Sequence, residues 1–259
     1  MPTEIKNISR TILRKPLLWI PFLLLTSIAF GGVNNLDTLS PQDLAPQEKK
    51  DVFAEGLVAL ESTNLRIAAH PDSIQPHWDN LRILYVLGVK DEKYLELGFK
   101  ELEQLQNLFS KSVTANAVDK NDFDKNLLSG YTGALHVVQA KHGFNLKSKW
   151  KNLEKGLPIL DTAVARESNQ TELRYLRLTC NYYLPFFLGR KAIVKEDFKM
   201  LGELLPKAVE NYPPKWFVSI AKFVVEKGDL QKTQKDLLMK SMQLAKEKMN
   251  QQERLVRQY

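Results

Sequence analysis

The chain contains 259 residues with a formal net charge of +7, and it is 44% hydrophobic and 26% charged, as is ordinary for a folded domain. Its single cysteine, Cys180, excludes an intrachain disulfide framework, so the fold must be held together by packing. Part of the positive charge lies in residues 1–16, where we interpret it as a sorting signal rather than a binding surface.

The N-terminal segment, residues 1–33, is predicted to direct the chain to a membrane. Residues 17–33, LLWIPFLLLTSIAFGGV, are apolar and uncharged, and residues 1–16 before them are basic. Because a basic flank stays in the cytoplasm, we expect the rest of the chain to be extracytoplasmic, with membrane contact through residues 17–33. This location makes nucleic acid an implausible partner, whereas a basic surface there suits anionic lipid or an acidic protein.

Two fates of this segment stay open, because its length lies between those of a signal-peptide core and a spanning helix. Small residues before the bond that follows Gly31 favour cleavage near Gly31. In contrast, Trp19 near the inner boundary suits an uncleaved anchor in the inner membrane. A buried core helix is the third interpretation, and the lack of any polar face in the run argues against it.

The remainder of the chain is predicted to be a spacer followed by helices. Residues 34–50 are polar and contain two prolines, which suits a spacer. In residues 51–259 apolar residues recur at helical spacing, and there is neither an alternating β-branched run nor an Asn-Gly or Asp-Gly turn. We therefore expect an all-α domain, with a long connection or seam at 110–122 and a bend at Pro158.

The expected helices group into hairpins at roughly 53–89, 123–168, 171–210 and 213–258, which predicts an array of antiparallel helical hairpins. One of these hairpins resembles a tetratricopeptide repeat. Gly156, Leu160 and Ala163 resemble its second helix, and Gly130, Tyr131 and Ala134 a degenerate first helix. The Trp-Leu-Gly-Tyr core and the closing proline of the repeat are absent. The resemblance implies a tetratricopeptide-like α-solenoid that acts by binding other proteins.

A second resemblance covers about 26 residues, through the segments ELRYLR (172–177), LPFFLG (184–189) and Glu196-Asp197. It is similar to a segment of small secreted helical proteins of bacteria. This resemblance implies a bacterial envelope protein whose extracytoplasmic part lies in the periplasm, and it implies no particular activity. Arg174 and Arg177 are three positions apart on one helix face, where Glu172 or Asp197 can pair with them. We interpret these four residues as a structural charge network, and a clamp for a ligand carboxylate is the alternative.

Other residues provide candidates for ligand or metal binding. The aromatic residues Tyr182, Tyr183, Phe186 and Phe187 are candidates to line a groove for a peptide or an apolar ligand, although core packing is the simpler interpretation. Cys180 is expected to be buried. His70 and His77 lie near acidic residues, but two prolines separate them, so we expect helix punctuation and neither a metal site nor a cofactor.

Nucleophile-elbow, phosphate-loop and dinucleotide motifs are absent from the sequence. We therefore expect no catalytic activity and predict an interaction or scaffold module that binds another envelope protein. The first alternative is a helical solute-binding component that encloses a small ligand, for which a deep, aromatic-lined cavity would be the evidence. The second is a hydrolase that uses carboxylates or the pair His70 and His77.

Overall fold

The computed structural model describes residues 46–112 and 118–257, and within these residues all regular secondary structure is helical, as the sequence predicts. The described residues contain nine α-helices and three short 3-10 helices. The α-helices are α2 (Pro46–Ala69), α3 (Ile74–Gly88), α4 (Glu92–Ser112), α5 (Val118–His142), α6 (Leu146–Arg166), α7 (Thr171–Tyr182), α8 (Lys191–Leu204), α9 (Pro214–Lys227) and α10 (Lys232–Arg257). The 3-10 helices are η3 (Phe186–Leu188), η4 (Leu205–Lys207) and η5 (Val209–Asn211).

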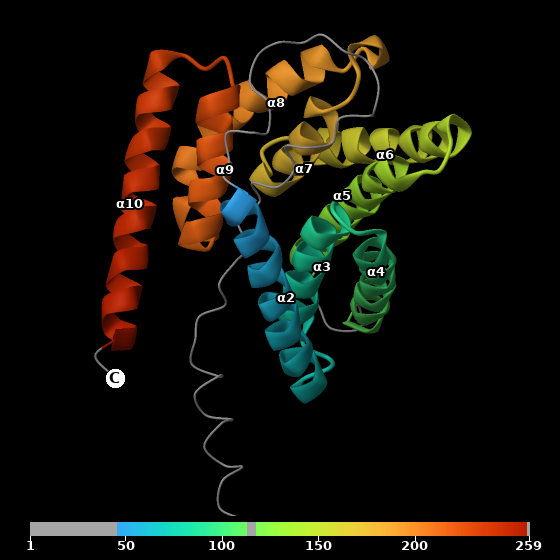
Figure 1. Ribbon diagram of the computed structural model, residues 1–259, viewed down its shortest axis with the longest axis horizontal. Coiled ribbons are helices and arrows are strands. Elements are labelled where there is room, and N and C mark those ends of the chain that lie inside the picture. Colours follow the sequence, from blue (N-terminus) through green and yellow to red (C-terminus); the bar gives the residue numbers. More distant parts are fainter. Residues whose placement is uncertain (1–45, 113–117, 258–259) are drawn as a thin grey trace, which may run out of the picture.

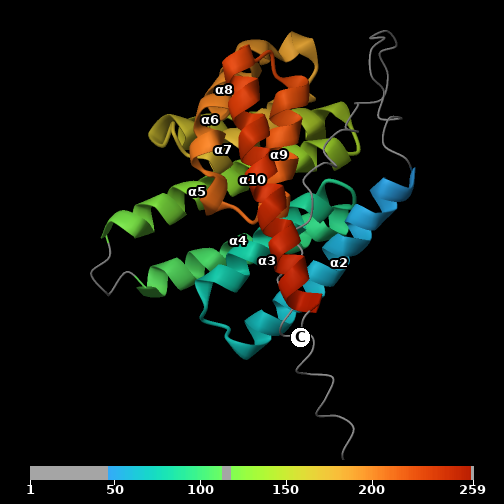
Figure 2. The ribbon, with the colours of Figure 1, turned by 90° about the vertical axis from the view of Figure 1, so that its left-hand side faces the viewer.

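Helices that follow one another in the chain pack side by side. Helix α3 packs on α4, α5 on α6, α7 on α8, and α9 on α10 (Figure 1). Helix α2 packs on α3, and α5 also contacts α7. Viewed from the side of α10, that helix lies across the outside of the molecule next to α9 (Figure 2). The packing order therefore follows the chain order.

The ends of these helices follow from local side-chain chemistry. The side chain of Asn145 accepts a hydrogen bond from the backbone N–H of Ser148 at 2.8 Å, so Asn145 caps α6. Pro214 occupies the first position of α9, where its missing N–H costs nothing. Pro158 lies inside α6, which continues through it from Leu146 to Arg166.

Two predicted boundaries need correction. Helix α2 begins at Pro46, so the last five residues of the predicted spacer 34–50 are helical. Residues 110–112 belong to α4 and 118–122 to α5, so most of the predicted connection at 110–122 is helical too. Small and polar residues are common in connections, but they are also tolerated in the terminal turns of helices. Residues 113–117 lie outside the described part of the chain.

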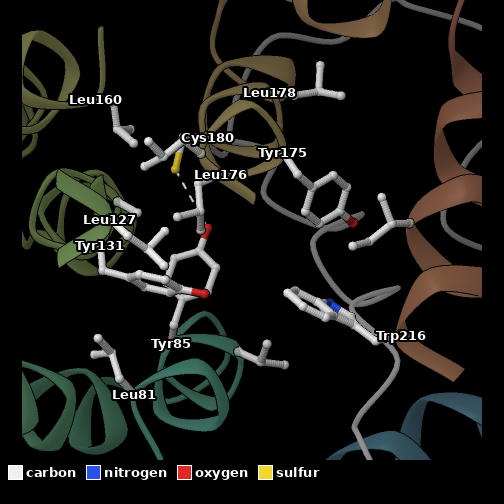
Figure 3. Close-up of a cluster of buried hydrophobic side chains, with 14 of the residues drawn as sticks. Leu81, Tyr85, Leu127, Tyr131, Leu160, Tyr175, Leu176, Leu178, Cys180 and Trp216 are labelled. Carbon is white, nitrogen blue, oxygen red and sulfur yellow. Dashed lines mark hydrogen bonds between the residues drawn. The ribbon is translucent and has the colours of Figure 1, made fainter. Parts of the chain in front are cut away.

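The centre of the core lies where α3, α5, α7 and α9 face one another (Figure 3). Tyr85 and Tyr131 are fully buried there, and their rings meet edge to face with centroids 5.9 Å apart. Cys180 is buried beside them, with its Sγ 3.6 Å from the hydroxyl of Tyr85. Burial raises the pKa of Cys180 to about 12, so its thiol is protonated and unreactive at neutral pH.

Helices α5 and α6 approach each other most closely at Gly133 and Gly156. A Cβ atom added to Gly156 would lie 2.5 Å from the carbonyl oxygen of Gly133, and one added to Gly133 would lie 2.8 Å from the carbonyl oxygen of Gly156. A backbone atom cannot move aside as a flexible side chain can, so neither position has room for a side chain. Gly156 is one of the residues that carry the tetratricopeptide resemblance, whereas Gly133 is not.

Among the described residues, none of the helices is both long enough and apolar enough to cross a membrane. The predicted membrane segment, residues 17–33, and the predicted cleavage position near Gly31 lie outside the described residues.

Candidate functional site

The structure brings three of the four predicted network residues together between α7 and α8. Asp197 of α8 accepts hydrogen bonds from Arg174 at 2.9 Å and from Arg177 at 2.9 and 2.7 Å. Arg174 also contacts Glu196 at 2.8 Å. The Asp197 side chain is completely buried, and the side chains of Arg174 and Arg177 are 4% and 8% exposed. A carboxylate held by two guanidinium groups thus joins the two helices.

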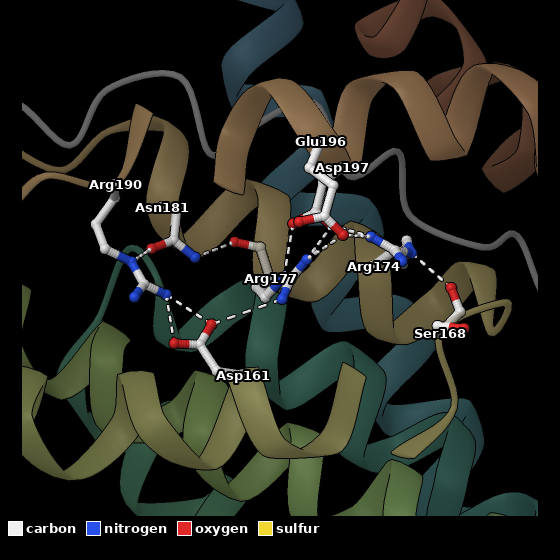
Figure 4. A network of polar contacts seen from close by, with 8 residues as sticks. All are labelled: Asp161, Ser168, Arg174, Arg177, Asn181, Arg190, Glu196 and Asp197. Carbon is white, nitrogen blue, oxygen red and sulfur yellow. Dashed lines mark hydrogen bonds and ion pairs between the residues drawn. The ribbon is translucent and has the colours of Figure 1, made fainter. Parts of the chain in front are cut away.

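This network continues from α8 to α6 (Figure 4). Arg190, at the start of α8, contacts both carboxylate oxygens of Asp161 at 2.7 and 2.9 Å, and it donates a hydrogen bond to the side chain of Asn181 at 2.5 Å. Asn181 in turn donates to the carbonyl of Arg177 at 2.7 Å. Because these contacts fix the start of α8 and the end of α7, they hold the turn between the two helices in place.

Burial and charge oppose each other in this network. Burial raises the pKa of the Asp197 carboxyl, although the hydrogen bonds and charges of Arg177 and Arg174 act in the opposite direction. In contrast, the hydrogen bond from Arg174 lowers the pKa of the half-exposed Glu196. Both arginines bind carboxylates of the protein itself, and Arg174 also donates a hydrogen bond to the carbonyl of Ser168 at 2.5 Å. This arrangement suits a structural network better than a clamp for a ligand carboxylate.

Glu172, the fourth predicted network residue, lies elsewhere and belongs to a second centre. Its carboxylate accepts hydrogen bonds from Arg82 of α3 at 2.8 and 3.0 Å and from the hydroxyl of Tyr131 at 2.6 Å. At about 100° per residue, Glu172 is rotated by about 140° from Arg177 around α7, so the two residues face different neighbours. Of the two carboxylates considered as partners of Arg174 and Arg177, Asp197 therefore binds them and Glu172 does not.

The second centre brings the first and the last parts of the described chain together. The guanidinium of Arg82 lies 5.6 Å from the ring centroid of Trp78 and 5.8 Å from that of Trp216 in α9. Nearby, Lys215 of α9 pairs with Glu55 of α2 at 2.7 Å. Although burial acts to lower it, the charge of Glu172 raises the pKa of Arg82, which therefore remains charged. The inner side of α3, α5, α7 and α9 is filled by the protein's own side chains.

The four aromatic residues predicted to line a groove separate into two pairs. Tyr182 and Tyr183 are half-buried, and the Tyr182 ring packs against Phe198 and Phe223 with centroids 5.8 and 5.4 Å away. Phe186 and Phe187 are 76% and 69% exposed on η3. The two pairs therefore do not form one groove, and only the second pair is available to a partner.

The turn that carries Phe186 and Phe187 has a fixed geometry. It begins at Pro185 and ends at Gly189, whose φ of 68° is a left-handed conformation that favours glycine. The next residue is Arg190, which the network holds against Asp161 and Asn181. The buried network and the exposed phenylalanine pair are thus parts of one structural unit, which we call the α7–α8 unit.

The two histidines considered for metal binding do not form a site. His77 is buried, and its two ring nitrogens contact Glu101 at 2.5 Å and the carbonyl of Pro71 at 2.9 Å, whereas His70 is exposed. In the described part of the chain no three His, Cys, Asp or Glu side chains are grouped so that they could hold a metal ion. His77 therefore braces α3 against α4 and the preceding turn.

A pocket of about 700 Å³ lies among α4, α5 and α6, away from the predicted aromatic residues. Its walls include Gln106, Lys125, Ser129 and Thr132, and Phe109 is the single aromatic residue among those that line it.

Comparisons of the chain with protein-family models, with curated proteins and with solved structures found no match.

Sequence reasoning missed Arg82, Asp161 and Arg190 as members of the two centres. Arg190 directly follows the segment LPFFLG (184–189), and its position after the glycine of a turn indicates a residue placed at the start of the next helix. Arg82 and Asp161 carried none, because their partners lie 90 and 29 positions away in the chain. Only the folded chain brings such residues together.

Proposed function

We propose that this protein is a non-catalytic interaction module of the bacterial envelope, built as a tetratricopeptide-like array of helical hairpins. The side-by-side pairs α3/α4, α5/α6, α7/α8 and α9/α10 support this interpretation, as does the close approach of α5 and α6 at Gly133 and Gly156. The module lies outside the inner membrane, and it is either anchored by residues 17–33 or released after cleavage near Gly31. Its partner is another envelope protein.

The contact site in this proposal is the turn of the α7–α8 unit. The observation that carries it is that Phe186 and Phe187 are 76% and 69% exposed, while the chain on both sides of them is fixed by buried charged contacts. Large aromatic residues that are held in place lose little conformational entropy on binding, and such residues dominate protein interfaces. Two neighbouring phenylalanines therefore suit an apolar pocket on a partner protein.

The inner side of the array is less suitable for a partner. Open hairpin arrays bind ligands on a concave face. Here Arg82 lies against Trp216, Lys215 pairs with Glu55, and the buried Tyr85 and Tyr131 fill the space between the helices. A partner would have to displace these contacts, so the outer turns are the better candidates.

The proposal is tested by site-specific photo-crosslinking in cells. A photoreactive amino acid replaces Phe187 in one variant and the 58% exposed Met239 of α10 in a matched control. We expect Phe187 to give one reproducible protein adduct that is absent at Met239 in the intact chain. The same adducts at both positions, or none at Phe187, would contradict the proposal.

A double variant, Phe186→Ser with Phe187→Ser, provides the quantitative test. Loss of two anchors at an interface costs at least about 2 kcal/mol, or roughly 30-fold in affinity, so the adduct of a reporter placed at Leu188 should disappear. Since both side chains are exposed, the melting temperature should stay within about 2 °C of wild type. If binding and the melting temperature fall together, the phenylalanine pair serves the fold rather than a partner.

A further inference from the structure

The turn between α5 and α6 exposes three large apolar side chains. Phe144 is 99% exposed, Leu146 84% and Trp150 49%. The sequence around them, KHGFNLKSKWK, is also basic, and no Asp or Glu occurs between Asp124 and Glu154. We call residues 143–151 the α5–α6 tip.

The tip is held firmly at its base. Lys141 donates a hydrogen bond to the carbonyl of Val89 at 2.6 Å, and the ring of His142 contacts the carbonyl of Gly88 at 2.8 Å. Asn145 caps the new helix, so only a few residues separate α5 from α6. In Figure 1 this turn lies at the right-hand extremity of the molecule. The apolar side chains therefore project from a short, rigid turn at the periphery.

The first turns of α6 place apolar and basic residues on adjoining stripes. Leu146 and Trp150 are four positions apart, and so share one side of the helix. Lys147 and Lys151 are each one position further along, which rotates them by about 100°. Lys147 and Lys151 are both exposed. An apolar edge flanked by lysines is the pattern by which protein segments bind at the boundary between lipid headgroups and acyl chains.

We infer that the α5–α6 tip binds the surface of an anionic phospholipid bilayer. Phe144 and Leu146 enter the boundary with the acyl chains, the ring of Trp150 lies at headgroup level, and Lys147 and Lys151 contact lipid phosphates. The choice of lipid over a protein partner rests on charge, since residues 143–151 carry lysines and no acidic residue, and the nearest acid along α6, Glu154, accepts a hydrogen bond from the Trp150 indole at 2.5 Å. A lysine cluster of this kind complements a uniformly negative surface. This inference is independent of the proposed partner of Phe186 and Phe187.

The experiment measures immersion of the tip itself, because the proposed membrane segment, residues 17–33, would hold the full chain on vesicles in any case. Phe144→Cys is introduced into the full chain and labelled with a nitroxide. The buried Cys180 thiol, with its pKa of about 12, escapes labelling. Matched controls carry the label at Val58→Cys in α2 and Met239→Cys in α10, which replace side chains that are 66% and 58% exposed.

Spin-label accessibility to oxygen and to a polar nickel complex is then compared in vesicles of phosphatidylcholine with and without phosphatidylglycerol. We expect position 144 to become protected from the nickel complex only when phosphatidylglycerol is present, while positions 58 and 239 stay accessible. Equal accessibility of position 144 in both vesicle types would overturn the inference. So would protection that appears only when proteins of native membranes are added, since that result identifies a protein partner.

A charge variant completes the test. The double variant Lys147→Gln with Lys151→Gln is made in the labelled chain. It should lower the affinity of the tip for phosphatidylglycerol vesicles, measured from the protection of position 144, by about 25-fold, since each lysine near an anionic surface contributes roughly fivefold to the binding constant. Lys235→Gln with Lys240→Gln in α10 is the matched control and should leave it unchanged. An equal loss in both variants would mean that net charge, rather than the tip, controls binding, and would overturn the inference.

Discussion

Helix α7 carries two arginine–carboxylate centres on different faces, and they differ in the sequence distance that they span. In the local centre, Asp197 binds Arg177 and Arg174, which are 20 and 23 positions away. In the long-range centre, Glu172 binds Arg82, 90 positions away, and the hydroxyl of Tyr131. The same kind of contact therefore holds one pair of neighbouring helices together in the first case and distant helices in the second.

This difference predicts what each centre controls. The local centre fixes the α7–α8 unit and with it the exposed phenylalanine pair. The long-range centre joins α3, α5 and α7, with Trp216 of α9 lying over the arginine. Asp197 is completely buried, whereas the side chain of Arg82 is 17% exposed and has Asp79 as a second carboxylate at 3.7 Å. We therefore expect loss of the local carboxylate to cost more stability.

Asp197→Ala should give the largest effect, because it leaves the buried Arg174 and Arg177 without their shared carboxylate. Breaking a buried pair in this way costs about 3–5 kcal/mol, which lowers the melting temperature of a domain of this size by roughly 6–20 °C. Calorimetry of the purified protein measures this change in melting temperature. The exposed Asp236→Ala is the control, and a shift no larger than that of the control would show that the local centre contributes no stability.

Arg177→Ala should cost less than Asp197→Ala, because Arg174 remains to neutralise Asp197. We expect about 2–3 kcal/mol, as for loss of hydrogen bonds to a charged group. The melting temperature should fall by roughly 4–12 °C. Lys191→Ala, an exposed change in the same helix pair, is the control. An unchanged melting temperature for Arg177→Ala would refute the structural role of the network.

Glu172→Gln distinguishes the two centres by which helices lose protection from hydrogen exchange, rather than by how much stability is lost. We expect a loss of about 2 kcal/mol, since Gln keeps the shape but not the charge that Arg82 binds. Amide hydrogen exchange should rise in α3 and α9, whose contact the long-range centre supports, and stay unchanged in α8. The exposed Glu203→Gln is the control. Faster exchange in α8 instead of α9 would contradict the assignment of separate roles.

The sequence was a good guide to what lies within one helix. Cys180 is predicted to be buried, and it is buried together with Leu173 and Leu176, which lie seven and four positions before it on the same helix. The Arg174 and Arg177 face was also predicted from their spacing. The mistake concerned Glu172, which is close in sequence but faces another direction, and whose real partner, Arg82, no local pattern indicates. Helical periodicity gives the face of a residue, not the neighbour on that face.

The aromatic residues show the same limit at a turn. Tyr182, Tyr183, Phe186 and Phe187 look alike in composition, yet the first two are half-buried and the last two are exposed. Pro185 marked the break between them, but the direction of the chain after it depends on Gly189 and on the contacts of Arg190. Exposure at a turn is thus decided by tertiary contacts that sequence spacing does not contain.

Arg190→Ala should separate the stability of the local centre from its effect on the turn. Arg190 and Asp161 are 17% and 33% exposed, so we expect a modest loss of about 1 kcal/mol. The larger change should be in the turn, where hydrogen exchange at Leu188 and Gly189 rises and crosslinking from position 187 falls. Lys195→Ala is the control. Undiminished crosslinking would show that the network does not position the phenylalanine pair.

Glu196→Gln should give the smallest effect, at the exposed margin of the local centre. Arg174 lowers the pKa of Glu196, but the side chain is 53% exposed, so solvent screens the pair and we expect less than about 1 kcal/mol. A carboxylate with a lowered pKa stabilises the fold above its ordinary pKa of 4.5, and this contribution disappears as the pH falls through the folded-state value. Urea denaturation curves of variant and wild type should therefore converge on acidification.

Asp197 makes this pH test informative about the whole centre. Because burial raises its pKa, its effect has the opposite sign: it favours the fold at low pH, and that contribution is lost as the pH rises through the folded-state value. The two carboxylates thus act in opposite directions in the wild type. The Glu196→Gln variant keeps the Asp197 contribution and lacks only that of Glu196, so its free energy of unfolding should approach that of the wild type as the pH falls. A gap that widens toward acid would mean that Arg174 does not bind Glu196 in solution.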